Sequence, residues 1–198
     1  MAGASWLVDG GAELRVAIRA ATEEDIEHIL EIERECISPP WTHGSLLSEV
    51  YNEDSFFALA LAEPVRAADL VMQADTTIAL VQSPDGAAAQ YGANTKNANN
   101  DTNHIVGFVI LRRAADECEL LQIAVDKASR RCGIAETLME AALRWARDAG
   151  AATVFLEVRK SNNAAIMLYE KHGFKKYGAR KNYYADPIED AVVMKLSL

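Results

Sequence analysis

The sequence has few cysteines, no long hydrophobic run and no basic residues near its first position. Its three cysteines, at positions 36, 118 and 132 of 198 residues, have no paired spacing, so we expect no disulfide framework and a reducing compartment. No segment approaches the ~20 apolar residues that cross a bilayer. Residues 1–14 lack the basic and apolar regions of a signal peptide. We therefore expect a cytoplasmic protein that does not bind membranes.

Positive charge is also scarce. The chain has 20 Lys and Arg against 29 Asp and Glu, a formal net charge of −9. Binding to nucleic-acid phosphates needs clustered positive charge, so we expect no DNA or RNA partner. An acidic surface attracts cationic partners instead, such as a basic protein or peptide. The four histidines show no metal-ligand spacing, and neither HExxH nor CxxC occurs, so we expect no metal.

The hydrophobic pattern predicts one α/β domain over residues 14–198, after a loose leader of small residues at 1–13. Residues 83–104 contain five Asn and no Val, Ile, Leu or Met, which is typical of a mobile insertion that buries little. Strands that alternate with helices and then end the chain indicate a mixed sheet with helices on its faces. Strands are predicted at 14–19, 56–61, 105–113, 120–125, 153–158, 174–180 and 191–196, and helices at 23–37, 42–50, 133–149 and 163–172.

One short motif lies between a predicted strand and a predicted helix: Arg130-Arg131-Cys132-Gly133-Ile134-Ala135. The first turn of a helix has backbone N–H groups without partners, and a glycine lets a phosphate approach them. The motif has neither the P-loop spacing nor the GxGxxG spacing. Taken alone, it fits a plain strand-to-helix turn with two solvated arginines equally well.

Together with a second motif some thirty residues further along the chain, this loop resembles the GNAT superfamily of acyl-CoA-dependent N-acetyltransferases. Residues 130–135 satisfy its [QR]-x-x-G-x-[GA] pattern, and Asn162, the Ala-Ile-x-Leu-Tyr run at 165–169 and Gly173-Phe174 match its later motif. The resemblance covers residues 105–196 well and 14–61 more loosely. Within the superfamily the sequence most resembles the bacterial ribosomal-protein alanine N-acetyltransferases, on the stretches 123–126, 156–162, 168–170, 180–184 and 189–191, and on Pro40-Trp41-Thr42.

The resemblance implies the GNAT fold, a central mixed sheet flanked by about four helices. It also implies transfer of acetyl from acetyl-CoA to a protein N-terminal amine, with the N-terminal alanine of a small-subunit ribosomal protein as the expected substrate. It places the general base at Glu157 and the general acid at Tyr169. A carboxylate can take the proton of an ammonium, and a tyrosine hydroxyl can donate one while neutral. The residues themselves also fit plainer roles, a salt-bridged strand residue for Glu157 and a core aromatic for Tyr169.

The resemblance further implies an acetyl-CoA site. The backbone of Ile123, Ala124 and Val125 is expected to contact the cofactor, and Asn162 to form a hydrogen bond with it. The charge of Glu136 is unfavourable beside phosphates unless its side chain points away. Cys132, at a helix N-terminus, is either a reactive thiol with a lowered pKa or a bystander. The pyrophosphate loop comprises Arg130, Arg131, Cys132, Gly133, Ile134, Ala135 and Glu136.

Trp41, Tyr183 and Tyr184 are candidates for the walls of a peptide groove, on loops expected at one edge of the sheet. Tyrosine hydroxyls can bind a peptide backbone while the rings pack on small side chains. Trp41 fits a core position equally well. We expect a monomer or weak dimer. The alternatives in function are a GNAT enzyme for lysine, another N-terminus or a small amine, a non-catalytic acyl-CoA-binding module, and a nucleotide-binding protein.

Overall fold

The computed structural model describes residues 5–8, 12–64 and 104–198. Its eight-stranded sheet has the order β1-β2-β3-β4-β5-β6-β8-β7. All neighbouring strands are antiparallel except β5 and β6, which are parallel, so the predicted mixed sheet is confirmed. The strands are β1 (Ser5–Val8), β2 (Ala12–Ala20), β3 (Ser55–Pro64), β4 (His104–Ala114), β5 (Glu117–Val125), β6 (Thr153–Arg159), β7 (Lys175–Ala185) and β8 (Ile188–Ser197).

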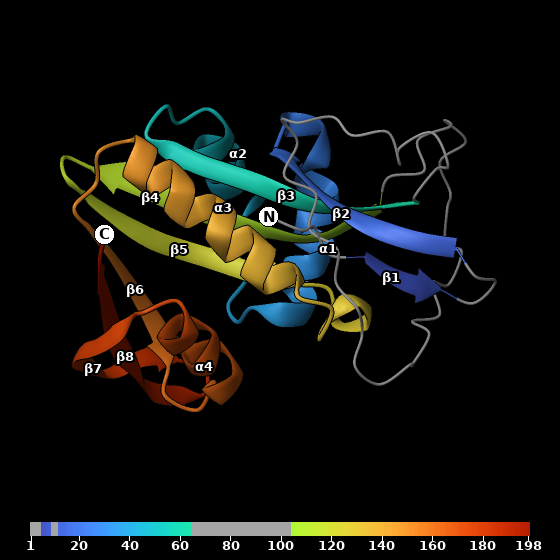
Figure 1. Ribbon diagram of the computed structural model, residues 1–198. Helices are drawn as coiled ribbons and strands as arrows, with labels where there is room; N and C mark the ends of the chain where they lie inside the picture. The colour runs from blue at the N-terminus through green and yellow to red at the C-terminus, as the bar shows by residue number, and fades with distance from the viewer. Residues whose placement is uncertain (1–4, 9–11, 65–103) are drawn as a thin grey trace.

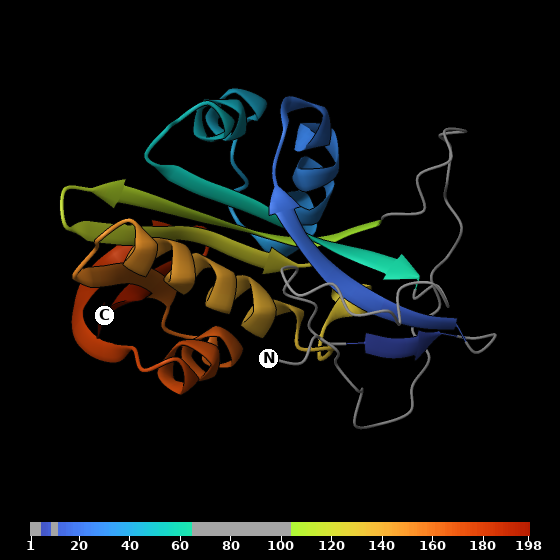
Figure 2. The ribbon, with the colours of Figure 1, turned by 45° about the horizontal axis from the view of Figure 1, so that its top comes forward.

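Four helices cover the two faces of the sheet, α1 and α2 on one face and α3 and α4 on the other (Figure 2). The central strand β4 is buried on both sides, because Phe108 and Ile110 face the α1 and α2 cluster while Val109 and Leu111 face the α3 cluster. This explains why residues 105–111 form a nearly continuous apolar run. The helices are α1 (Ile26–Cys36), α2 (His43–Val50), α3 (Ile134–Asp148) and α4 (Asn163–Lys171).

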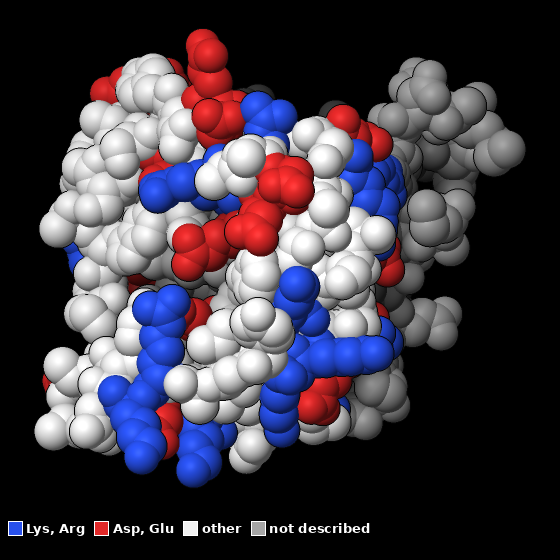
Figure 3. Space-filling model, turned by 90° about the vertical axis from the view of Figure 1, so that its left-hand side faces the viewer, with Lys and Arg blue, Asp and Glu red and all other residues white. Residues whose placement is uncertain are grey.

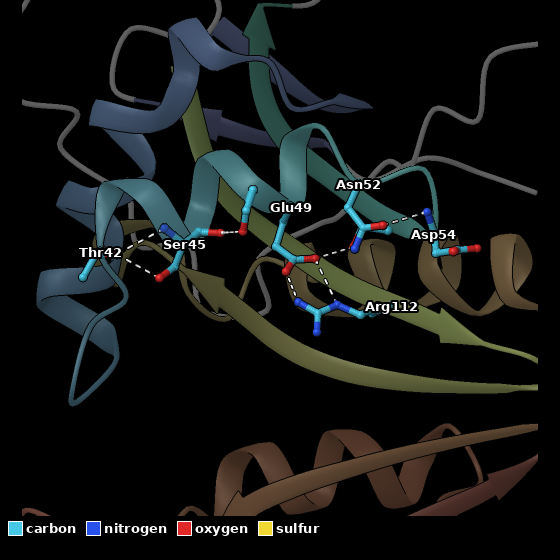
Figure 4. Close-up of polar contacts among 8 residues, drawn as sticks. Thr42, Ser45, Glu49, Asn52, Asp54 and Arg112 are labelled. Atoms are coloured by element: carbon cyan, nitrogen blue, oxygen red, sulfur yellow. Dashed lines mark hydrogen bonds and ion pairs between the residues drawn. The ribbon is translucent and has the colours of Figure 1, made fainter.

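Polar contacts fix the short helix α2 (Figure 4). Thr42 caps its first turn, where the Thr42 hydroxyl oxygen accepts a hydrogen bond from the Ser45 N–H at 3.1 Å. Glu49, near the other end, has a buried carboxylate that pairs with Arg112 on β4. A buried charge is tolerated only when it is paired and hydrogen-bonded. The pair therefore holds α2, and with it the connection from α1, against the sheet.

The strands β5 and β6 diverge partway along their length, where β6 turns away from β5 (Figure 1). They pair only between residues 117–120 and 153–156. Beyond this point β5 pairs with β4 alone and β6 with β8 alone. A register shift opposite Ile110 and Leu111 leaves Leu121 as an extra residue, and such bulges increase local twist. The β6-facing edge of residues 121–125 consequently has no strand partner in the described part of the chain.

The structure corrects two expectations at the ends of the chain. Residues 5–8 and 12–13, expected in a loose leader, are strand, because β1 and the start of β2 pair with each other. The loop expected around residues 182–184 is wrong as well, since β7 continues to Ala185 through a bulge at which Asn182 has a φ of 53°. The insertion expected at 83–104 lies outside the described residues except for His104, which begins β4.

Among the described residues, no helix combines the length and apolar character needed to cross a membrane. In the same residues, no group of three or more His, Cys, Asp or Glu side chains is arranged to hold a metal ion. The three cysteines are unpaired, as the spacing predicted.

Candidate active site

Glu157 lies on β6 just past the point where that strand leaves β5, opposite Val193 of β8. Its side chain is 13% exposed, and its Oε1 atom lies 2.7 Å from Nε of Arg180 on β7. The Tyr183 hydroxyl also donates a hydrogen bond to this carboxylate, and that bond is the main reason why the pKa of Tyr183 rises to about 12. Glu157 is thus salt-bridged, which fits the alternative that it is a structural residue of the strand. Its two neighbours also hold the carboxylate in one orientation.

Three tyrosines extend from Glu157 toward α4. The rings of Tyr183 and Tyr184 meet edge to face with centroids 5.2 Å apart. Tyr184 in turn lies close enough to Tyr169 on α4 to affect its ionisation. Tyr169 is buried, and burial raises the pKa of its hydroxyl because the phenolate loses solvation. Its hydroxyl therefore keeps its proton at neutral pH, as a proton donor requires.

Tyr169 is also a core aromatic residue, which was the alternative role that the sequence left open. Its ring packs against Phe174 with centroids 5.9 Å apart and belongs to the hydrophobic cluster of α3 and α4. Both roles are compatible, since the ring packs while the hydroxyl remains a polar group.

Two residues of the loop before α3 have left-handed backbone conformations. Gly133 has a φ of 74° and Arg131 a φ of 67°, both left-handed. Gly133 is the N-cap of α3, and no side chain caps this helix end. The backbone N–H groups of the first turn are thus presented at the positive end of a 15-residue helix. This end is suited to binding an anion.

Arg130 and Cys132 are engaged within this loop. The Arg130 guanidinium donates from Nε to the Val125 carbonyl oxygen at 3.2 Å, and its Nη2 atom lies 3.1 Å from Sγ of Cys36. It thereby fastens the end of β5 to the loop and to α1. Cys132 is buried, and burial raises the pKa of its thiol. Of the two roles expected for Cys132, the reactive thiol is therefore wrong.

Glu136 and Asn162 have partners that sequence reasoning did not identify. Lys171 on α4 lies with its Nζ 2.7 Å from Oε1 of Glu136, so a cation offsets the charge that is unfavourable beside phosphates. The Asn162 side-chain oxygen accepts the Ala165 N–H at 3.1 Å and caps α4. A cofactor bond from Asn162 would thus come from its amide nitrogen, and it stays a prediction.

Trp41 is half-buried and packs against the cluster beneath α1 and α2. Its backbone N–H donates to Oε2 of Glu33 at 2.9 Å. Glu33 is fully buried near the end of α1, and this burial raises the pKa of its carboxyl. The structure thus places Trp41 at the edge of this hydrophobic core, and its expected place in a peptide groove stays a prediction.

Two arginines near Glu157 were missed by sequence reasoning. Arg159 follows Glu157 by two residues on the same strand, and a period of two places both side chains on one face of the sheet. This spacing was a signal that sequence reasoning did not use. The stretch 180–184 carried part of the family resemblance, but no sequence signal places Arg180 beside Glu157, because that approach depends on how the β7–β8 hairpin is registered.

Charge is distributed unevenly despite the acidic total. Residues 159–198 contain eight Lys and Arg against four Asp and Glu. Figure 3 shows Lys and Arg side chains gathered low on this face, toward the end where α4, β7 and β8 lie, with most of the visible carboxylates above them. The surface formed by residues 159–198 is therefore more favourable to an anion than the net charge suggests.

Comparison with known proteins is consistent with this geometry. Residues 26–174 match the family described as "Acetyltransferase (GNAT) family". A [ribosomal protein bS18]-alanine N-acetyltransferase of Haemophilus ducreyi is 30% identical over 91% of this chain and 99% of its own length. The enzyme of that name from Escherichia coli K12 is 42% identical over 48% of this chain and 65% of its own length. A crystal structure of the Escherichia coli ribosomal-protein-S18-alanine N-acetyltransferase superposes with a TM-score of 0.65 at 27% identity, over 92% of this chain and 93% of that one.

Proposed function

This chain belongs to the acetyltransferase (GNAT) family and is an acetyl-CoA-dependent N-acetyltransferase, and we propose that its acceptor is a protein N-terminal amine. The observation that carries this proposal is the position of Glu157, held by Tyr183 and Arg180 where β6 leaves β5. The relatives named above act on the alanine of ribosomal protein bS18, so that N-terminus is the first candidate substrate.

The described residues fit the cofactor that this family uses. The unpaired edge of β5 offers the backbone of Ile123, Ala124 and Val125 to an extended ligand arm. The uncapped first turn of α3 and the residues around Gly133 suit a pyrophosphate. Ile134 is buried, so it contributes through its backbone. The loop residues 130–136 and Asn162 are accordingly proposed to hold acetyl-CoA.

Acetyl transfer to an amine requires a general base and a general acid from this chain. When bound, acetyl-CoA supplies a thioester carbonyl that the free amine attacks. Glu157 is the proposed base that takes a proton from the incoming ammonium, directly or through one water. Tyr169 is the proposed acid: as the C–N bond forms and the C–S bond breaks, its hydroxyl, which stays protonated well above neutral pH, gives its proton to the departing thiolate, and the second proton of the attacking amine replaces it. Backbone N–H groups of β5 are proposed to polarise the acetyl carbonyl.

Acceptor binding is assigned to the tyrosines and the acidic helix α1. Tyr183 is 48% exposed, so its ring is accessible to a peptide while its hydroxyl orients Glu157. Helix α1 carries three exposed glutamates, Glu27, Glu31 and Glu35, and one arginine, and such a surface attracts a basic protein terminus. Both features favour a cationic peptide as acceptor.

The test measures thiol release from acetyl-CoA with a peptide that begins with Ala-Arg. Controls are the same peptide with a blocked α-amine and a blocked peptide that carries an internal lysine. Turnover that requires the free α-amine supports N-terminal acetylation. Turnover on the blocked lysine peptide would instead assign the enzyme to lysine side chains, and binding of acetyl-CoA without turnover would refute the peptide acceptor.

A further inference from the structure

We propose that Arg159 is a positioning residue of the acceptor site, which joins the loop between α1 and α2 to the β7–β8 turn and so sets the shape of the groove beside Glu157. This inference rests on the proposed function, because it concerns the side of the site where the amine enters. It adds a residue for which neither the motif nor the family comparison provides a role.

A single guanidinium makes the contacts that join these segments. Nη2 of Arg159 donates to the backbone carbonyl oxygens of Ser38, at 3.0 Å, and Asp186, at 2.7 Å. Nη1 donates to the Pro187 carbonyl oxygen at 3.2 Å and to Oε2 of Glu189 at 3.3 Å. Ser38 follows α1, whereas the other three partners belong to the β7–β8 hairpin. One side chain therefore connects segments more than 120 residues apart in the sequence.

Two further contacts make this connection rigid. The guanidinium carbon lies 4.2 Å from the ring centroid of Tyr184, a distance typical of a cation–π contact. The second carboxylate oxygen of Glu189 accepts the Ser161 N–H at 2.5 Å, which ties the turn before α4 to the same group. The Arg159 side chain is only 19% exposed, so these bonds are partly shielded from water.

The position of these contacts explains why they matter for the acceptor. Arg159 lies on the same strand face as Glu157, two residues further on. The loop that it holds carries Trp41, and the hairpin that it holds carries Tyr183 and Tyr184. All its described contacts lie on this side of the site, and none involves the loop 130–136. Its loss should therefore alter acceptor binding and leave cofactor binding intact.

A guanidinium is required by this geometry. Its planar fork directs several N–H groups at acceptors in different directions, whereas a lysine ammonium is a single point charge. Lysine at position 159 keeps the charge near Glu189 but cannot span both Ser38 and Asp186. We expect Arg159→Lys to restore only part of the effect of Arg159→Met.

The experiment measures peptide KM, kcat and acetyl-CoA affinity for Arg159→Met, Arg159→Lys and a matched control, Arg113→Met. Arg113 also makes three hydrogen bonds, to Asp54 and the Ala149 carbonyl oxygen, near the β4–β5 turn. We expect Arg159→Met to raise peptide KM about 10-fold or more, since small misplacements of a substrate are costly. Acetyl-CoA affinity should stay within about twofold, and Arg113→Met should leave peptide KM unchanged.

A peptide KM within about twofold of the wild type in Arg159→Met would overturn the proposal, as would an equal loss of acetyl-CoA affinity or an equal rise in KM for Arg113→Met. If Arg159→Met does not fold, Arg159→Lys provides the same comparison. If the wild type acetylates no α-amine peptide, the proposed function fails by itself. Hydrogen exchange then tests the connection, and residues 37–42 should exchange faster in the Arg159 variants than in Arg113→Met.

Discussion

Tyr183 of β7 and Glu157 of β6 are joined by a hydrogen bond in which the phenol donates to the carboxylate. The two strands are not neighbours, since β8 lies between them. The two side chains therefore meet across β8. The bond links a residue that is proposed to line the peptide groove to the proposed base. An acceptor that displaces the Tyr183 ring would therefore also affect the orientation of Glu157.

Replacing the proposed base should separate binding from chemistry. In Glu157→Gln the shape and the contacts with β7 are nearly kept, but the group that takes the proton is lost. We expect turnover to fall about 100-fold or more near neutral pH, with acetyl-CoA affinity within about twofold of the wild type. Glu53→Gln, at an exposed position between α2 and β3, is the matched control. Unchanged turnover in Glu157→Gln would assign the base to another group.

Removal of the Tyr183 hydroxyl should be visible in both kinetics and alkaline titration. Because the pKa of Tyr183 is about 12, compared with about 10 in an unfolded chain, the folded chain binds an extra proton between these values. Stability therefore falls as pH rises through this window, and Tyr183→Phe should lose that part of the dependence. Absorbance of tyrosinate and denaturant unfolding at rising pH measure both effects.

The same variant should weaken turnover while the exposed Tyr177→Phe, on the same strand, should not. A wild-type titration that shows no tyrosine shifted upward, or equal turnover in the two variants, would contradict this assignment.

The buried carboxyl of Glu33 should cost stability at neutral pH. Burial raises its pKa, and the hydrogen bond from the Trp41 N–H to Oε2 offsets this only in part, so the folded chain binds the proton more tightly and stability falls as pH rises above about 4.5. Glu33→Gln keeps an oxygen for the Trp41 N–H without the charge. We expect it to be as stable as the wild type or more so at pH 7.

Glu33→Ala is the contrasting change, because it leaves the Trp41 N–H without its acceptor. We expect a loss of about 1–3 kcal/mol in the free energy of unfolding. Denaturant titrations at pH 5 and pH 7 check both variants, and a greater stability of the wild type over Glu33→Gln at pH 7 than at pH 5 would refute the sign of the shift.

A methyl group added at Gly107 on β4 should displace the backbone of β5, the strand proposed to contact acetyl-CoA. Gly107 on β4 faces Val125 on β5, and a Cβ there would lie 2.7 Å from the Ala124 carbonyl oxygen. The backbone of β5 must shift to accept it. We expect Gly107→Ala to lose about 1–3 kcal/mol of stability and to bind acetyl-CoA more weakly.

Gly178→Ala on β7 is the control, since no atom of the described residues lies within 4 Å of an added Cβ at that position. Thermal unfolding and calorimetric titration with acetyl-CoA distinguish the two variants. Equal cofactor affinity in both would show that β5 tolerates the shift.

Much of the local structure around the proposed cofactor loop could be predicted from the sequence because its determinants are local. The glycine that precedes α3 and the start of a helix at Thr42 were both predicted, and both depend on neighbours within a few residues. The alternation of strands and helices likewise predicted the mixed sheet. The prediction of a loop at 182–184 was wrong, because β7 continues through these residues by way of a bulge.

What only the tertiary structure decided is which residues surround Glu157. The sequence determined that a glutamate stands on the strand at 153–159, but Arg180 and Tyr183 reach it from β7 across β8. In a sheet, a register slip of one residue sends every side chain to the opposite face. The bulge between Arg180 and Tyr184 sets that register, and the Arg159 contacts join segments far apart in the chain. Such long-range geometry has no signature in local sequence, because it depends on how the hairpin and the α1–α2 loop pack together.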